Sequence, residues 1–75
     1  MSVADFLINV HPELPVHERT QLEDELGRMG GVMSACFSPG HPHIMTVTYN
    51  PDAVSSGTVL AQVGARGIEA SKIGL

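Results

Sequence analysis

The chain has 75 residues, of which 43% are hydrophobic, and it carries a formal net charge of −4. This length fits a single domain over residues 1–75, and the hydrophobic content is that of a folded globular protein rather than a disordered one. Only four side chains are lysine or arginine. They are scattered along the sequence, so nucleic acid and anionic membrane surfaces are not expected partners.

The first half of the chain predicts a strand followed by a helix. Apolar and polar residues alternate over residues 4–10, which is the pattern of a half-buried strand. Apolar residues then recur at helical spacing, so a helix is expected over residues 16–29. Gly30 and Gly31 follow it and favour a left-handed end to this helix.

The second half predicts a strand over 32–37, a turn over 38–43, a strand over 44–49, a helix over 55–66 and a strand over 68–73. Pro39-Gly40 is a strong turn signal, and Ser55 or Ser56 can cap the second helix. The order β-α-β-β-α-β predicts an α+β, ferredoxin-like fold, in which two helices cover one face of a four-stranded antiparallel sheet. The other face is expected to be mostly polar and to include Cys36.

Long segments of the sequence resemble the heavy-metal-associated domain, which is found in copper chaperones and in the cytosolic tails of metal-pumping ATPases. QLEDELGRMGGVMSACFS (21–38) is similar to the first helix and second strand of that family. VTYNPDAVSSGTVLAQV (47–63) is similar to its third strand and second helix, and GIEASKIGL (67–75) to its last strand. The resemblance implies the ferredoxin-like fold and a metal-related function, with a metal transporter or another protein as the partner.

The sequence departs from this family at the metal motif, Met-x-Cys-x-x-Cys. Glu13 stands at the methionine position, and Pro15 and Glu18 stand at the two cysteine positions. Because thiolates are what select Cu(I), the family's Cu(I) chemistry is not carried over to this chain. The only cysteine, Cys36, allows no internal disulfide. A small side chain on a sheet face and a redox or metal role are both open interpretations for it.

All four histidines are expected at one end of the fold. In this topology the loop after the first strand, with His11 and His17, emerges at the same end as the turn with His41 and His43. Glu13 lies in the same loop. Imidazole and carboxylate ligands suit Zn²⁺, Ni²⁺, Co²⁺ or Cu²⁺, so these five residues are the predicted metal ligands. Exposed histidines that bind no metal are the alternative.

Two functions are therefore expected from the sequence. The first is a small cytoplasmic protein that binds or carries a divalent transition metal through loop histidine and glutamate ligands. The second is a metal-free interaction or regulatory module, either as a homodimer or with another protein, which uses the open sheet face or an edge strand. Pro12 and Pro15 fit this second function, because they stiffen the loop without a metal.

Catalysis and membrane insertion are not expected. A domain of this size has little room for a deep pocket, and a catalytic pair of Glu13 and Glu18 has no other support in the sequence. The first residues lack the basic region and the long apolar run of a signal peptide. No segment has the composition of a transmembrane helix.

Overall fold

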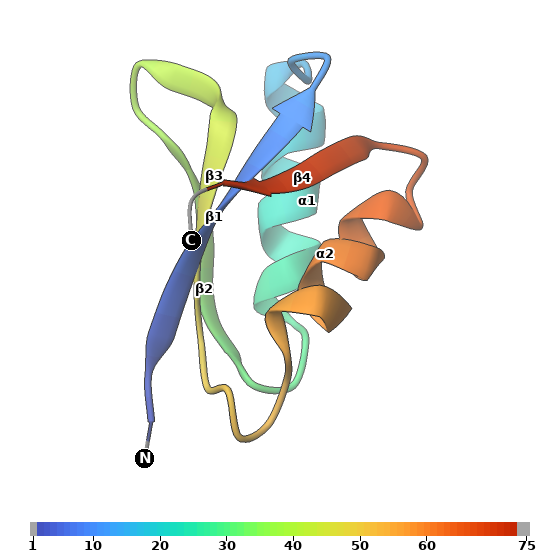
Figure 1. Cartoon of the computed structure of the whole chain (residues 1–75). Coiled ribbons are helices and arrows are strands. Elements are labelled where there is room, and N and C mark those ends of the chain that lie inside the picture. Colours follow the sequence, from blue (N-terminus) through green and yellow to red (C-terminus); the bar gives the residue numbers. More distant parts are fainter. Residues whose placement is uncertain (1, 74–75) are drawn as a thin grey trace.

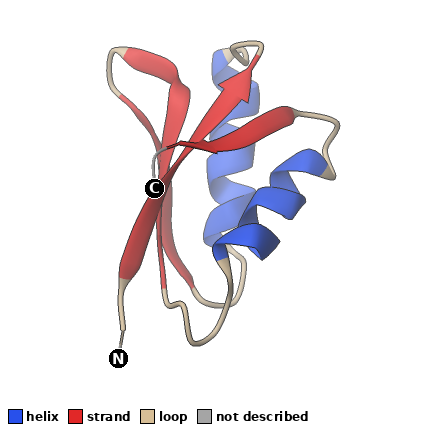
Figure 2. Cartoon of the chain, in the orientation of Figure 1, coloured by secondary structure: helices blue, strands red, loops and turns tan. Residues whose placement is uncertain are grey.

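The computed structural model describes residues 2–73 as one four-stranded sheet with two helices on one face (Figures 1 and 2). The elements are β1 (Ala4–His11), α1 (Val16–Gly27), β2 (Val32–Ser38), β3 (His41–Tyr49), α2 (Ser56–Gly64) and β4 (Glu69–Ile73). The strand order is β2-β3-β1-β4, and every neighbouring pair is antiparallel. The predicted fold is confirmed. Within residues 2–73 no helix combines the length and the hydropathy needed to cross a bilayer.

The core lies between the sheet and the helices because each strand alternates its side chains between two faces. Burial alternates along β1 and along the second half of β3, as the predicted pattern requires. Each helix contributes buried residues four positions apart. The buried hydrophobic residues are Phe6, Ile8, Val10, Leu22, Leu26, Met45, Val47, Tyr49, Val59 and Val63.

The predicted helix ends are confirmed in part. The Ser55 hydroxyl accepts a hydrogen bond from the Thr58 backbone N–H at 3.0 Å and so caps α2. Gly31 has a φ of +94°, and a Cβ there would come within 2.8 Å of Val54 Cγ1. Glycine is therefore required both by the backbone and by the close approach. Helix α1 begins after its N-cap Pro15 and ends at Gly27, two residues before the predicted end. Its C-cap, Arg28, is right-handed with a φ of −90°, so the predicted left-handed end of this helix is wrong; the positive φ of Gly31 belongs to the connection that follows.

The predicted turn over residues 38–43 is wrong in extent. The turn comprises only Pro39 and Gly40, and β3 begins directly after it at His41. The β2–β3 register shifts between Phe37–Met45 and Ser38–His41, so residues 42–44 have no partner in β2. A bulge of this kind can include the proline at position 42. Because proline is rare inside strands, the sequence pattern predicted that the strand begins only at residue 44.

Candidate functional site

The elements that carry the histidines reach the same end of the molecule (Figure 1), as predicted. Figure 1 shows the β1–α1 loop and the β2–β3 hairpin at the same end of the sheet. His11 is the last residue of β1, His17 lies in the first turn of α1, and His41 and His43 lie on β3. All four side chains are exposed. Among residues 2–73, however, no three His, Cys, Asp or Glu side chains lie close enough together to hold a metal ion.

The imidazoles of His41 and His43 lie near each other. Among the described residues, no other two histidine rings do so. Their ring centres are 6.4 Å apart, and the ring planes meet at 81°. The two residues are separated by one position on β3. His41 is paired with Ser38 of β2, whereas His43 lies among residues 42–44, which have no partner in β2. Two exposed imidazoles from the same strand therefore lie near each other at the tip of the hairpin.

His11 lies away from this pair, on the face of the sheet that the helices leave open. Ile8 and Val10 are fully buried, so the alternation along β1 turns Asn9 and His11 to the opposite face. Across the β1–β4 ladder, His11 is opposite Glu69. Glu69 is absent from the predicted ligand set, because its proximity to His11 depends on the register of two strands far apart in sequence.

Glu13 is engaged by a residue that the sequence analysis did not single out, Arg19. The Arg19 guanidinium donates a hydrogen bond to the Leu14 carbonyl oxygen at 2.7 Å and lies 3.6 Å from the Glu13 carboxylate. The backbone N–H groups of Glu18 and Arg19 both donate to the Pro15 carbonyl at 3.0 Å. We call the Arg19 contacts to Glu13 and Leu14 the Arg19 clasp. The clasp ties the β1–α1 loop to the first turn of α1.

Cys36 lies on the open face, as predicted. It is exposed and is paired with Thr46 of β3, while the flanking residues Ala35 and Phe37 are paired with the buried Val47 and Met45. No thiol from another residue is available in this chain, because it contains a single cysteine.

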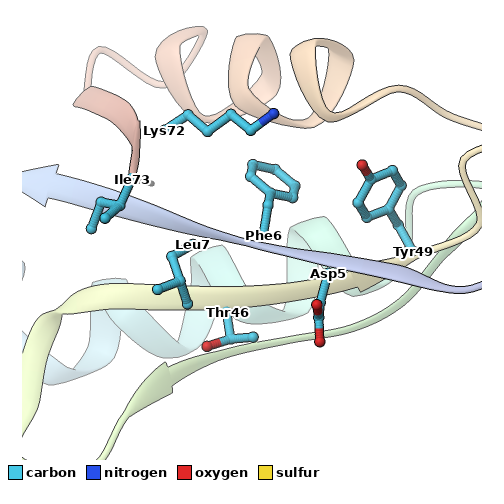
Figure 3. Close-up of a pocket in the computed structure, with 7 residues that line it drawn as sticks. All are labelled: Asp5, Phe6, Leu7, Thr46, Tyr49, Lys72 and Ile73. Carbon is cyan, nitrogen blue, oxygen red and sulfur yellow. The ribbon is translucent and has the colours of Figure 1, made fainter. Parts of the chain in front are cut away.

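A hollow of about 410 Å³ lies at the sheet edge where β4 ends beside β1. Figure 3 shows Phe6, Tyr49 and Lys72 on one side of β1, and Leu7, Thr46 and Asp5 on the other. The Lys72 ammonium lies 5.7 Å from the centre of the Phe6 ring. The lining residues include neither an imidazole nor a thiol, so this hollow is not part of the predicted metal site.

No protein-family model and no curated protein matches the chain, whereas solved structures match it closely. Oxidized MerP from Ralstonia metallidurans CH34 has a TM-score of 0.84 and 11% identity, covering 97% of this chain and 100% of that chain. The N-terminal domain of a potential copper-translocating P-type ATPase from Bacillus subtilis, in its Cu(I)-loaded state, has a TM-score of 0.85 and 19% identity. The match covers 97% of this chain and 90% of that chain.

A third match is the N-terminal domain of the zinc(II) ATPase ZiaA in its apo form. It has a TM-score of 0.77 and 23% identity, covering 99% of this chain and 73% of that chain. The identities in all three comparisons are low, and what the proteins share with this chain is the arrangement of strands and helices. The chain thus has the fold of the heavy-metal-associated domains, built on a sequence with a single cysteine.

Proposed function

We propose that this protein binds a divalent transition-metal ion through His41 and His43 and passes it to a partner protein. The observation that carries the proposal is the pair of exposed imidazoles, with ring centres 6.4 Å apart, at the tip of the β2–β3 hairpin. Similarity to the B. subtilis and ZiaA domains supports a metal-handling function at a coarse level, since copper and zinc are the metals of those two ATPases.

The distance between the two rings suits a shared metal after a small adjustment. With metal–nitrogen bonds of about 2.0–2.1 Å, a tetrahedral ion holds two imidazole ring centres roughly 5 Å apart, so the rings must approach by about 1 Å. Both side chains are exposed and can make this approach by rotating about their own bonds. Imidazole ligands suit Zn²⁺, Ni²⁺, Co²⁺ and Cu²⁺.

Two protein ligands leave the remaining coordination positions to water or to a partner. A site that is open in this way favours transfer, because a partner's ligand can bind before either imidazole leaves. A metal transporter of the cytoplasmic membrane face is the partner that fits this proposal, with the protein itself in the cytoplasm. Participation of His11, Glu13 and His17 stays a prediction; for Glu13 it would place the metal ion beside the Arg19 guanidinium.

The Arg19 clasp favours a second candidate function, a metal-free interaction module on the same fold. A cationic guanidinium fixed against Glu13 and Leu14 holds the β1–α1 loop without a metal ion. It also places a positive charge beside Glu13, which opposes the approach of a second cation. In this case the exposed residues of the open sheet face would contact another protein or a second copy of the chain.

A ¹H–¹⁵N NMR titration with Zn²⁺, Ni²⁺ and Cu²⁺ distinguishes the two functions. Hairpin binding predicts saturable shifts over residues 39–44, which disappear in the His41→Ala/His43→Ala variant while the rest of the spectrum is retained. Shifts over residues 39–44 that do not saturate, or that survive in the double variant, would contradict the hairpin site. Absence of any metal effect would favour the interaction module.

A further inference from the structure

Four polar side chains surround a small hollow on the open face of the sheet, at the junction of β1 and β4. Two cross-strand pairs on either side of the Val10–Ala70 pair supply them, Asn9 with Ser71 and His11 with Glu69. The hollow has a volume of about 110 Å³ and is lined by these four residues and Ala70. It includes neither hairpin histidine and neither residue of the Arg19–Glu13 pair.

The four side chains share one face of the sheet. Asn9 and His11 alternate with the fully buried Ile8 and Val10, so they point away from the helices. Residues directly opposite one another in an antiparallel pair lie on the same face, with Cβ atoms about 4.5–5.5 Å apart. Glu69 and Ser71 therefore face the same hollow from β4.

The imidazole of His11 and the carboxylate of Glu69 are unengaged within residues 2–73. No hydrogen bond or ion pair there involves either side chain, whereas the carboxylates of Glu13, Glu23 and Glu25 all have partners. A histidine and a glutamate that face each other across two strands without bonding leave a position between them for a shared ligand. The Asn9 amide oxygen and the Ser71 hydroxyl add two neutral oxygen donors two positions along the ladder.

We propose that this hollow binds a divalent cation of the Zn²⁺ type, with His11 and Glu69 as the principal ligands and Asn9 and Ser71 as additional oxygen donors. Metal–ligand distances of about 2.0–2.2 Å allow one ion to bridge an imidazole and a carboxylate on directly opposite strand positions. Nitrogen and oxygen donors without sulfur suit divalent ions and disfavour Cu(I). Water completes the coordination, because the hollow opens to solvent through the exposed His11 and Glu69.

This site is independent of the hairpin site and does not rest on the proposed function. Its ligands come from β1 and β4, whereas His41 and His43 come from β3. The two sites differ also in donor type, since the hairpin offers two imidazoles and the hollow one imidazole with oxygen donors. A metal titration that follows each amide separately can therefore assign binding to one, both or neither.

The test uses the His41→Ala/His43→Ala variant of the full chain, in which hairpin binding is removed. Zn²⁺ alone is titrated and followed by ¹H–¹⁵N NMR. We expect saturable shifts over residues 9–11 and 69–71, and a decrease in zinc affinity of at least tenfold when Glu69→Gln or His11→Asn is added. The matched control is Asp52→Asn, which removes the same charge from an exposed residue in the β3–α2 connection and is expected to leave the affinity within twofold.

The outcomes separate this inference from the proposed function. Absence of shifts over residues 9–11 and 69–71 overturns the inference, and so does an unchanged affinity in the Glu69→Gln variant. Zinc shifts over residues 39–44 in the wild-type chain support the hairpin site whatever happens in the hollow. Both substituted side chains are exposed, and the amide spectrum of each variant before zinc is added shows directly whether it is folded.

Discussion

The β1–α1 loop and the β2–β3 hairpin lie at the same end of the molecule (Figure 1) and carry similar residues, but they are held in different ways. In the loop, Arg19 binds both Glu13 and the Leu14 carbonyl. In the hairpin, His41 and His43 are exposed and contact each other with ring centres 6.4 Å apart.

This difference shows why a shared end does not make a shared site. The Glu13 carboxylate lies 3.6 Å from the Arg19 guanidinium, so a metal ion bound by Glu13 would lie beside a second positive charge. Among residues 2–73, neither hairpin imidazole takes part in an ion pair. The hypothesis to test is therefore that Arg19 stabilises the loop, whereas the hairpin binds the metal ion.

The largest expected effect is the loss of metal binding in the His41→Ala/His43→Ala variant. Removing both imidazoles should lower zinc affinity for the hairpin at least about 100-fold, which corresponds to about 2.7 kcal/mol. The free energy of unfolding should change by less than about 0.5 kcal/mol, because both side chains are exposed. Calorimetric titration and urea unfolding measure the two quantities, with His17→Ala as the control. Equal losses in the control and the double variant would remove the distinction between loop and hairpin.

The next effect is a loss of stability in Arg19→Ala. The Arg19 side chain is only 21% exposed and makes both clasp contacts, so its removal should lower the free energy of unfolding by about 1 kcal/mol. Amide exchange over residues 13–19 should accelerate, while zinc affinity at the hairpin stays unchanged. Arg28→Ala, at the other end of α1, provides the control in a urea unfolding series. An effect no larger than that of the control would mean that the clasp does not stabilise the loop.

Glu13→Gln should have a smaller effect than Arg19→Ala. The Glu13 side chain is 58% exposed and its carboxylate lies 3.6 Å from the guanidinium, so solvent screens the pair and its contribution should be no more than about 0.5 kcal/mol. The difference in unfolding free energy from wild type should shrink further in high salt. A loss as large as that in Arg19→Ala would show instead that the ion pair, rather than the hydrogen bond to Leu14, dominates the clasp.

The smallest expected effect is that of Cys36→Ser. Cys36 lies on β2, next to the histidine-bearing strand, but it is paired with Thr46 rather than with either histidine. Zinc affinity should therefore stay within twofold of the wild-type value in the same calorimetric titration. A larger decrease would show that the Cys36 thiol is also a ligand at the hairpin site. The site would then contain a softer ligand than two imidazoles alone provide.

Local patterns in the sequence were sufficient for most of the fold. Alternation over residues 4–10 and 44–49 correctly separates the buried from the open face, because side-chain direction in a strand has a period of two whatever the partner strand is. The Ser55 cap was likewise predictable, since it is a local backbone requirement. The left-handed glycine was predicted at the end of α1, whereas Gly31 lies in the connection beyond the right-handed C-cap Arg28. The extent of the β2–β3 turn was not predictable in this way, because Pro42 lies inside a strand at a bulge.

The sequence by itself determined the element order, the sheet faces and the end of the fold at which the histidines lie. Only the tertiary structure decided which of them have neighbours that can share a ligand. His11 lies opposite Glu69 because of the β1–β4 register, Glu13 is paired with Arg19, and His41 contacts His43 beside a bulge. The hydrophobic period and the order of the elements follow from short segments of sequence. These pairings depend instead on strand register and side-chain packing, which many distant contacts set together.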